Sequence, residues 1–552
     1  MSIYDDRPWL ARYGADMPAD LEREHESALA MFEAAVRRRP YETLLRYYSA
    51  SLTLAEVDRL AGAIAAALKA LGVERGDRVA LFMQNVPQYV LAMIATWKAG
   101  AIAVSVNPMN RERELAGLLE DSGAKVLVAL EDLYADVGEA VVSGTAVEVV
   151  ITTSELDLLH GEVPPALAHV QRRRAPGTHD LLELARRHEG QVIDRQQFTG
   201  EDVAVLTYTS GTTGPPKGAM NTHGNVAFAS QAYRDWMRLR PDHDVILGVA
   251  PLFHVTGLIA HIGLSLLMGA PLVLMGRFDA AICLEEIERH RATFTVASIT
   301  VFIALMNHPD AAHRDLSSLN KAMSGGAPVS PATAAAWEQT TGTPIHVVYG
   351  LTETTSPTHA VPLGATAPVD ETSGALSVGV PVFSTSVRVV DEAGQDVAAG
   401  ELGEFVTSGP QVVPGYWNKP EESEHAIAGG ALHTGDIGFM DDDGWFYLVD
   451  RKKDMINASG YKVWPREVED VLYQHGAVRE AAVVGVPDEY RGETVKAFVS
   501  LRPGASADPA DLVSFCKQRM AAYKYPRAVE IVDELPKTAS GKILRRSLRD
   551  QS

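Results

Sequence analysis

A loop of small hydroxyl residues and glycines is the part of this sequence whose residue types most clearly could do chemistry. It reads Thr209-Ser210-Gly211-Thr212-Thr213-Gly214-Pro215-Pro216-Lys217-Gly218 and follows Val203–Tyr208, an apolar, β-branched stretch that predicts a buried strand. Glycines let backbone N–H groups approach an anion, hydroxyls add donors, and Lys217 adds a mobile positive charge. The loop therefore predicts a phosphate site. An ordinary Gly/Ser/Thr turn is the alternative for the loop alone, and the spacing is not that of a P-loop.

Five further motifs follow in order along the chain. They are Pro251-Leu252-Phe253-His254-Val255-Thr256-Gly257, Tyr349-Gly350-Leu351-Thr352-Glu353-Thr354, Thr434-Gly435-Asp436, Asp450-Arg451-Lys452-Lys453-Asp454 and Pro536-Lys537-Thr538-Ala539-Ser540-Gly541-Lys542. Each is short enough to arise by chance, whereas the ordered set is specific. Together they resemble the adenylate-forming superfamily, whose members are acyl-CoA synthetases, peptide-synthetase adenylation domains and firefly luciferase.

This resemblance implies a reaction in which a carboxylate attacks the α-phosphate of ATP to give acyl-AMP and pyrophosphate. Such transfers are catalysed by positioning and electrostatics. The resemblance assigns the β,γ-phosphates to residues 209–214 and Lys217, and the α-phosphate to Thr352. Glu353 is expected to hold Mg²⁺, a hard cation that prefers carboxylate oxygen. A plain surface carboxylate is the alternative for Glu353 or Asp436 taken alone.

The resemblance also implies a nucleoside site and a reaction centre. Adenine is expected between Tyr349-Gly350 and the stretch Gly325, Gly326, Ala327 and Pro328, where glycines let backbone lie flat against a base. The ribose is expected at Asp436 and Arg451. Lys542 is expected to reach the carboxylate and the α-phosphate. We leave Lys452, Arg466 and Lys537 as solvated charges.

His254 follows an apolar triplet, where a satisfied core histidine is the alternative to a functional one. In the family an aromatic at this position closes the acyl pocket, and it need not act as acid or base. The pocket is expected from segments 249–258, 297–302 and 324–327, which contain no Arg, Lys, Asp or Glu. An unbranched apolar acid is therefore the expected substrate.

Transfer to a thiol is the second half-reaction that the resemblance implies. In the family the C-terminal domain rotates about a hinge, here expected at Lys453, and Ser459, Gly460 and Tyr461 are expected to line a tunnel for the pantetheine arm of coenzyme A. Firefly luciferase has a lysine four residues beyond the pivot, where this chain has Asn457. Light-producing oxidation is therefore not expected.

Alternating helical and strand patterns must position these motifs. The first half predicts helices at 54–71, 88–98 and 112–120 between strands at 78–82, 100–106 and 125–130. Helices between strands are typical of parallel sheets with covered faces. We also expect an N-terminal helix at 21–37. Residues 258–275 predict a buried helix that turns at Gly269-Ala270-Pro271 into a strand.

The expected fold class is α/β, with two domains. An N-terminal AMP-binding domain over 1–452 would hold two stacked α/β subdomains, about 1–200 and 201–372, and a β-rich subdomain, 373–450, built from hairpins. A mobile α+β lid domain would cover 453–552, with a proline-initiated helix at 465–473. A chain of 552 residues is too long for one core.

Composition limits the partners of the chain. Fifty Lys and Arg against 71 Asp and Glu leave a net charge of −21, which opposes binding to nucleic acid or an anionic membrane. The two cysteines suit a reducing compartment, and the N-terminus lacks a signal peptide pattern. We expect a cytoplasmic protein without an integral membrane segment. The sequence leaves a homodimer open.

The substrates that the sequence predicts are a small carboxylic acid, ATP and coenzyme A. The segments Arg7-Pro8-Trp9-Leu10 and Asp450–Ile456 resemble bacterial long-chain fatty-acid–CoA ligases, so a fatty-acyl-CoA synthetase is the first hypothesis. The alternatives are an aryl-CoA synthetase for benzoate- or coumarate-like acids, a ligase that loads a carrier protein, and a nucleotide-binding regulatory protein without turnover. Glu353 and Lys542 argue against the last.

Overall fold

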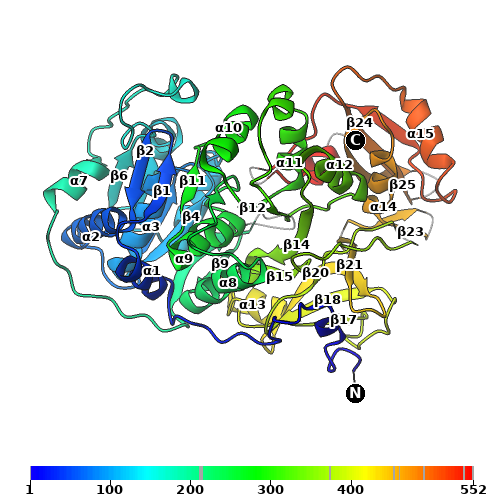
Figure 1. The fold of residues 1–552 in the computed structure, drawn as a ribbon, viewed down its shortest axis with the longest axis horizontal. Coiled ribbons are helices and arrows are strands. Elements are labelled where there is room, and N and C mark those ends of the chain that lie inside the picture. The colour runs from blue at the N-terminus through cyan, green and yellow to red at the C-terminus, as the bar shows by residue number, and fades with distance from the viewer. Residues whose placement is uncertain are drawn as a thin grey trace.

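Four β-sheets with covering helices build the molecule in this computed structural model, which describes residues 2–209, 216–371, 374–451, 454–458, 461–488, 492–538 and 541–549. In Figure 1 the chain begins at the lower right, below β17, and then forms the blue and cyan elements at the left, the green elements in the centre and the yellow and orange elements towards the right. The arrangement confirms the α/β class, with a large N-terminal part and a C-terminal part that contains its own sheet. The expected domain boundaries stay predictions.

The first large sheet carries the phosphate loop at one edge. Its strands lie parallel except for the last pair, β8 and β9, which are antiparallel and flank the loop. Within the described residues the spatial order is β7 (His179–Asp180), β6 (Val149–Thr153), β5 (Val126–Leu130), β3 (Arg78–Phe82), β4 (Ile102–Val106), β8 (Val203–Tyr208) and β9 (Gly218–Thr222).

The second large sheet carries the nucleoside motifs. Its spatial order is β16 (Val380–Pro381), β15 (Ser356–Ala360), β14 (Ile345–Leu351), β13 (Lys321–Ser324), β12 (Phe294–Ala297), β10 (Ile246–Leu247), β11 (Leu272–Leu274), β1 (Thr43–Tyr47) and β2 (Ala50–Thr53). Since β1 and β2 pair here while β8 and β9 lie in the first sheet, sheet membership does not follow the expected division near residue 200. The chain crosses between the sheets instead.

Helices cover both sheets and begin where the sequence provides caps. Thr53 and Glu56 form a capping box at α2, and Gly123 ends α4 in the left-handed conformation. The helices are α1 (Ala28–Arg38), α2 (Leu54–Ala70), α3 (Pro87–Lys98), α4 (Glu112–Ser122), α5 (Glu131–Leu133), α6 (Glu139–Val142), α7 (Leu181–Arg187), α8 (His223–Trp236), α9 (Leu264–Met268), α10 (Ala280–His290), α11 (Ile299–Met306), α12 (Pro331–Thr341), α13 (Pro420–Ala426), α14 (Pro465–Tyr473), α15 (Pro509–Lys517) and α16 (Arg545–Arg549).

The N-terminal helix is shorter than the sequence predicts. It begins at Ala28, because Ser27 caps it by accepting a hydrogen bond from the Ala30 amide. The preceding residues bond elsewhere: the amide of Leu21 donates to Ser384 and that of Glu24 to Gln231. Those bonds replace the intrahelical ones, so the prediction of a helix over 21–37 is wrong for its first seven residues.

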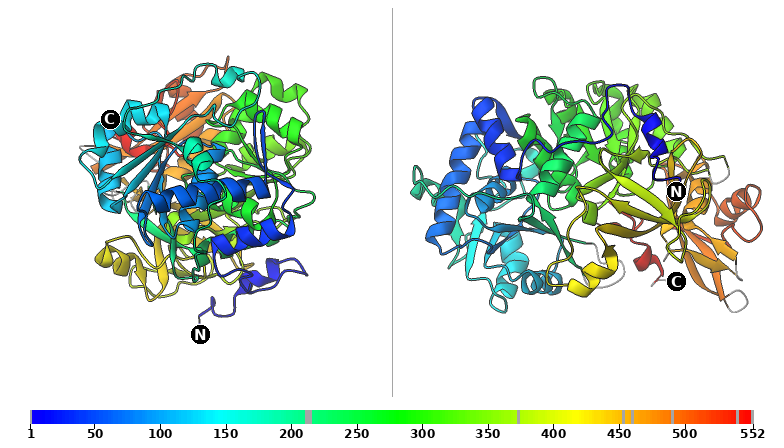
Figure 2. Two further views of the ribbon diagram at one scale, coloured as in Figure 1. Left: turned by 90° about the vertical axis from the view of Figure 1, so that its left-hand side faces the viewer. Right: turned by 90° about the horizontal axis from the view of Figure 1, so that it is seen from below.

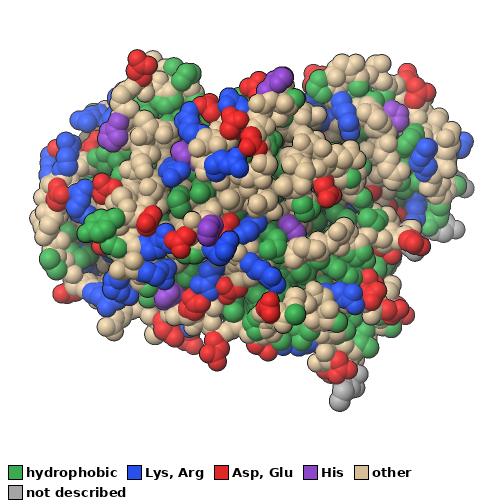
Figure 3. Space-filling view, in the orientation of Figure 1, with side chains coloured by type: hydrophobic (Ala, Val, Ile, Leu, Met, Phe, Trp, Pro, Cys, Tyr) green, Lys and Arg blue, Asp and Glu red, His purple; other side chains and the backbone are tan. Residues whose placement is uncertain are grey.

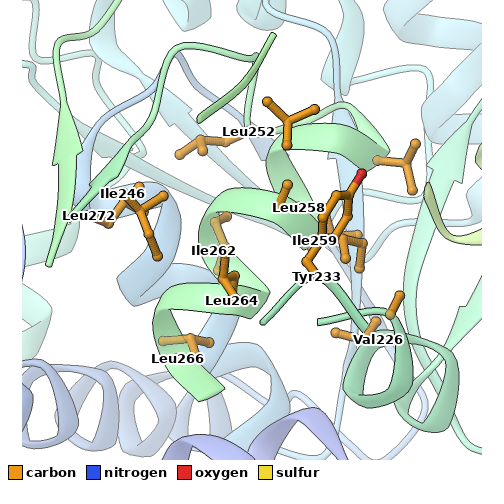
Figure 4. Packing of buried hydrophobic residues seen from close by; sticks show 14 of the residues in the cluster. Val226, Tyr233, Ile246, Leu252, Leu258, Ile259, Ile262, Leu264, Leu266 and Leu272 are labelled. Carbon is orange, nitrogen blue, oxygen red and sulfur yellow. The ribbon is translucent and has the colours of Figure 1, made fainter. Parts of the chain in front are cut away.

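A buried helical segment lies under the second sheet. The π-helix η4 (Gly257–Gly263) runs on into α9, and β11 follows after the turn, as the pattern over 258–275 predicts. Figure 4 shows Leu258, Ile259 and Ile262 of η4 packed between Tyr233 and Val226 of α8 and the strand residues Ile246 and Leu272. This core fixes the position of the motif that contains His254.

Two smaller sheets complete the fold. The first has β17 (Ser386–Val390), β18 (Gly403–Ser408), β20 (Ala431–Met440), β19 (Ile427–Ala428) and β21 (Phe446–Arg451); the second has β23 (Tyr461–Val463), β22 (Ile456–Ala458), β25 (Gly492–Leu501), β24 (Val478–Asp488) and β26 (Ala528–Ile531). Seen from below in Figure 2 (right), the orange C-terminal sheet lies at one end of the molecule, and the blue helices that follow the N-terminal segment lie towards the other end.

The surface and the helices limit how the protein meets other molecules. On the face shown in Figure 3, acidic and basic side chains are interspersed, without one continuous basic field. Among the described residues, no helix is both long enough and apolar enough to cross a membrane.

Candidate functional site

A cleft of about 580 Å³ lies where the C-terminal part meets the second large sheet. The carboxyl ends of β13 and β14 open into it, the usual place for ligands in α/β sheets. The expected nucleoside residues Gly326, Ala327, Pro328, Tyr349, Gly350 and Asp436 line this cleft together with Lys542. The structure therefore brings together residues that lie more than 200 positions apart in the sequence.

Tyr349 and Asp436 form a hydrogen-bonded pair in this cleft. The Tyr349 hydroxyl donates to Asp436 Oδ2 at 2.7 Å, and both side chains are buried. A charge-assisted bond of this length fixes both groups relative to each other. Arg451 ends the neighbouring strand β21, opposite Asp436 in the sheet register.

Two glycines allow close approaches in the site: Gly350 lies against the backbone of Ser356, and Gly326 lies against the side chain of Lys542. A Cβ at Gly350 would lie 1.5 Å from the carbonyl oxygen of Ser356, and one at Gly326 would lie 3.2 Å from Cε of Lys542. Gly326 also has φ +75°, a conformation that favours glycine. A larger side chain at either position would therefore displace the strand pair or the lysine.

A second, smaller pocket of about 30 Å³ adjoins the cleft. Gly326, Val348, Gly350 and Lys542 line both, so the two spaces meet at the lysine. Among the other residues around the pocket are His254, Thr352, Val255, Val296, Leu351, Tyr233 and Ser356. Segments 249–258 and 324–327 contribute to the small pocket, whereas Ile299 and Thr300 of segment 297–302 line the cleft. That this pocket binds the acid stays a prediction.

His254 is a neutral imidazole in this pocket. Burial, and then the ammonium of Lys542, lower its pKa to about 3. Nδ1 accepts a hydrogen bond from the Thr256 amide at 3.3 Å, which leaves the proton on Nε2. A group with this pKa cannot serve as a general base that cycles its proton near pH 7, so His254 is suited to shaping and polarising the pocket.

Lys542 is presented by a short closed segment. The Lys542 amide donates to Thr538 Oγ1 at 3.1 Å, and the Thr538 amide donates to the Lys542 carbonyl at 2.7 Å. Gly541 has φ +80°, and a Cβ there would lie 2.5 Å from the hydroxyl oxygens of Ser298 and Thr300. Glycine is therefore required for the segment to approach α11.

The two ends of the phosphate loop are joined. The Thr209 amide donates to the Lys217 carbonyl at 3.0 Å, and the Lys217 amide donates to Thr209 Oγ1 at 3.2 Å. Ser210, Gly211, Thr212, Thr213 and Gly214 lie outside the described residues. Lys217 Nζ lies 5.0 Å from the centre of the Tyr416 ring.

Glu353 follows β14 in the 3₁₀ turn η6 (Thr352–Thr354). Its carboxylate accepts a 2.7 Å hydrogen bond from the Tyr416 hydroxyl, and its carbonyl accepts one from the Val413 amide at 2.9 Å. Within the described ranges, no group of three or more His, Cys, Asp or Glu side chains could hold a metal ion. A single carboxylate fits Mg²⁺ that is bound mainly through substrate phosphates and water.

Several residues in or near the site carry no motif signal by themselves. For Tyr233, Ser356 and Tyr416 the reason is that their partners lie far away in the sequence.

Arg466, expected to be a solvated charge, is instead buried: its guanidinium donates to the Leu448 carbonyl at 2.6 Å and lies 3.6 Å from Asp470. Lys537 pairs with the buried carboxylate of Glu480 at 2.7 Å. The spacing of Arg466 and Asp470, i and i+4 on one helix, was the available signal.

The expected hinge and thiol tunnel fall largely outside the described residues. Lys452, Lys453, Ser459 and Gly460 are not among them, and Tyr461 is described only as the first residue of β23. Their roles stay predictions.

Comparison with known proteins accounts for almost the whole chain. The model described as AMP-binding enzyme matches residues 32–417, and the AMP-binding enzyme C-terminal domain matches residues 467–542. A long-chain-fatty-acid–CoA ligase of Bacillus subtilis (strain 168) is 37% identical over 555 residues, 99% of this chain and 98% of the relative. A feruloyl-CoA synthase of Amycolatopsis sp is 36% identical over 513 residues, 93% and 96% of the two chains.

A solved structure agrees with these relatives. An anthranilate CoA ligase in complex with anthranoyl-AMP superposes with a TM-score of 0.86 at 30% identity, covering 97% of this chain and 98% of the other. The resemblance inferred from the motifs is confirmed, and this chain belongs to the AMP-binding family of adenylate-forming enzymes.

Proposed function

We propose that the protein is an ATP-dependent acid–CoA ligase that activates a fatty acid. The observation that carries this proposal is the meeting of the cleft and the small pocket at Lys542. A nucleotide in the cleft and an acid in the pocket would bring the α-phosphate and the carboxylate to the same ammonium. Placing two reactants in this way removes much of the entropic barrier.

In the first half-reaction, a carboxylate oxygen forms a bond to the α-phosphorus while the bond to pyrophosphate breaks. Lys542 and Thr352 would stabilise the charge that shifts at this centre. Tyr349 and Asp436 would orient the nucleoside, with Arg451 beside them, and neutral His254 would close the acid pocket. No proton has to be removed from a carboxylate, which agrees with a histidine that stays neutral.

In the second half-reaction, a thiol attacks the acyl carbon and AMP leaves with the acyl–oxygen bond broken. Lys453 would be the pivot that replaces the Lys542 segment by the Ser459, Gly460 and Tyr461 segment. Loop residues 209–214 and Lys217 would bind the outer phosphates in the first step. Mg²⁺ bound at Glu353 would screen the charge of the triphosphate.

A fatty acid is supported as substrate by the relatives and by the pocket walls. The Bacillus subtilis relative, which matches this chain over nearly the full length of both, is named a long-chain-fatty-acid–CoA ligase. Val255, Val296, Val348 and Leu351 supply apolar pocket surface, and Lys542 is the one Arg, Lys, Asp or Glu side chain among the described residues that line the pocket. Apolar acyl chains gain about 0.8 kcal/mol for each CH₂ that is buried.

An aryl acid is the second candidate. The pocket is small, and the hydroxyls of Tyr233 and Ser356 belong to its wall. The Amycolatopsis relative is named a feruloyl-CoA synthase, and the solved anthranilate ligase is also close in structure. A short, partly polar pocket fits a ring with a hydroxyl better than it fits a straight chain.

A panel of acids separates the candidates. CoA-dependent release of AMP would be measured with hexanoate, octanoate, dodecanoate, hexadecanoate, benzoate and 4-coumarate. We expect dodecanoate to exceed benzoate and coumarate. Equal or better turnover with either aryl acid than with octanoate and dodecanoate would replace the fatty-acid proposal. A ligase that loads a carrier protein would form acyl-AMP in pyrophosphate exchange but release no thioester with free CoA.

The two cysteines bear on the cellular setting. Cys283 and Cys516 are buried and unpaired, which suits the reducing cytoplasm that we propose for the enzyme. A homodimer stays a prediction of the sequence.

A further inference from the structure

Tyr416 lies in a loop that neither the motifs nor the relatives assign to the reaction. Tyr416 forms an isolated antiparallel β-bridge with Ala219 of β9, the strand that directly follows the phosphate loop. The Met220 amide donates to the Gly415 carbonyl at 3.0 Å, and the Trp417 amide donates to the Gly218 carbonyl at 2.8 Å. The Tyr416 amide donates to Ser423 Oγ at 2.8 Å. The backbone at Tyr416 is therefore held from two sides.

One side chain contacts both charged groups expected at the triphosphate. The Tyr416 hydroxyl donates to Glu353 Oε1 at 2.7 Å, and Lys217 Nζ lies 5.0 Å from the centre of the same ring. The first contact is a charge-assisted hydrogen bond and the second a cation–π contact. The Tyr416 side chain therefore connects the Glu353 carboxylate to the Lys217 ammonium.

The surroundings of Tyr416 hold its side chain in place. Its side chain is 7% exposed and packs with Ala219 and Val413. The same loop also holds the Glu353 backbone through Val413.

We propose that Tyr416 is a positioning residue for the magnesium–triphosphate group. Its hydroxyl holds one carboxylate oxygen of Glu353, so the other oxygen would be available to Mg²⁺, and its ring contacts Lys217, which would bind the outer phosphates. The inference rests on the proposed function, which requires ATP at this site. It predicts that Tyr416 matters for Mg·ATP and not for AMP, which lacks the outer phosphates.

Isothermal titration calorimetry of Mg·ATP and AMP binding tests the role of Tyr416 without an acid or a thiol. Tyr416→Phe removes the hydroxyl and keeps the ring, while Tyr416→Leu removes both. We expect Tyr416→Phe to weaken Mg·ATP binding about tenfold, the usual effect of losing a hydrogen bond to a charged group, with AMP affinity unchanged. Tyr416→Leu should also weaken binding of ATP without magnesium, because Lys217 loses the ring.

Tyr447→Phe is the matched control. Tyr447 is also a buried tyrosine, on β21, and its hydroxyl donates to the carboxylate of Asp441 at 3.0 Å. Neither Tyr447 nor Asp441 lines the cleft or the pocket. It should bind Mg·ATP and AMP as the wild type does. In pyrophosphate exchange with the acid that the panel selects, Tyr416→Phe should raise the magnesium concentration for half-maximal rate and leave the rate at saturation nearly unchanged.

A double-mutant cycle decides whether Tyr416 acts through Glu353. In a Glu353→Gln background the Phe substitution should cost little more, because the carboxylate that it positions is gone. Wild-type Mg·ATP affinity in Tyr416→Phe would overturn the proposal. Equal weakening of Mg·ATP and AMP, or loss of a cooperative unfolding transition, would show a structural contact and overturn it too. Absence of CoA ligation with every acid would affect only the proposed function.

Discussion

Tyr233 should limit the length of the acyl chain. Its hydroxyl is hydrogen-bonded to Ser356 Oγ at 2.9 Å, and both residues line the pocket but not the cleft. The pocket volume of about 30 Å³ leaves room for only a few water-sized groups. A long chain therefore needs space that side chains of the pocket wall, such as the Tyr233 ring, occupy in this structure. Figure 4 shows this ring beside Leu258 and Ile259 of η4.

Tyr233→Ala tests this reasoning, with Tyr233→Phe as its matched control. The alanine variant removes the ring and makes room for about three further methylenes at ~0.8 kcal/mol each. Their sum of about 2.4 kcal/mol corresponds to a roughly 50-fold rise in the kcat/KM ratio of dodecanoate to hexanoate. The phenylalanine variant keeps the ring and loses only the bond to Ser356, so its ratio should match that of the wild type.

The assay is CoA-dependent AMP release with saturated acids from hexanoate to hexadecanoate. Removing a buried aromatic ring costs about 3–5 kcal/mol of stability, so each variant is first compared by thermal unfolding, and rates are taken below the transition. An unchanged chain-length profile in Tyr233→Ala would refute the role of Tyr233. The same shift in Tyr233→Phe would show that the hydrogen bond to Ser356, and not the ring, sets the limit.

Three further predictions concern the half-reactions and pH. Lys542→Ala should slow acyl-AMP formation by about 10²–10³ and leave thioester formation from supplied acyl-AMP and CoA near wild type; equal losses in both steps would show a structural lysine. Lys453→Pro restricts backbone rotation at the expected pivot, so pyrophosphate exchange should survive while thioester formation falls sharply, and wild-type rates in both would place the pivot elsewhere. Burial, and then Asp132, raise the pKa of Glu155 to about 7, so the folded state loses stability relative to the unfolded state as pH rises from about 4.5 to about 7. In denaturant unfolding, the free energy of unfolding of Glu155→Gln relative to that of wild type should therefore rise by up to roughly 3 kcal/mol between pH 4.5 and pH 8. An equal difference between the two proteins at both pH values would contradict this.

Local signals account for the elements that sequence reasoning locates well. Strand β3 and helix α14 have the predicted bounds, because one is a short, mainly apolar run and the other begins with a proline at its first turn. Helix α1 is shorter than its pattern predicts, since its true start depends on bonds to Ser384 and Gln231. A pattern of apolar residues carries no information about partners so far away.

The same limit applies to the site. The motifs predict Tyr349, Asp436, Lys542 and His254 one at a time, and the structure places them around two adjoining spaces. The sequence could not predict the hydrogen bonds between residues of different motifs, such as the bond of Tyr349 to Asp436. It also could not predict bonds between a motif residue and a residue outside the motifs, such as the bond of Tyr416 to Glu353. These contacts depend on how the sheets are arranged, which sequence periodicity does not describe.

The position of Lys542 depends on an ion-pair cluster three residues further along the chain. Arg545 lies 2.8 Å from Glu469 of α14, 3.2 Å from Asp450 of β21 and 3.5 Å from Asp454, and Arg549 lies 2.7 Å from Asp454. Asp450 and Asp454 flank the expected pivot on either side. Removing one partner from a buried ion pair leaves an uncompensated charge, which is costly. A rotation that separated Asp450 from Glu469 would therefore withdraw Lys542 from the pocket, and Arg545 would need other partners for its charge. In this conformation the ion-pair cluster therefore holds the segment of Lys542 against the residues that flank the expected pivot.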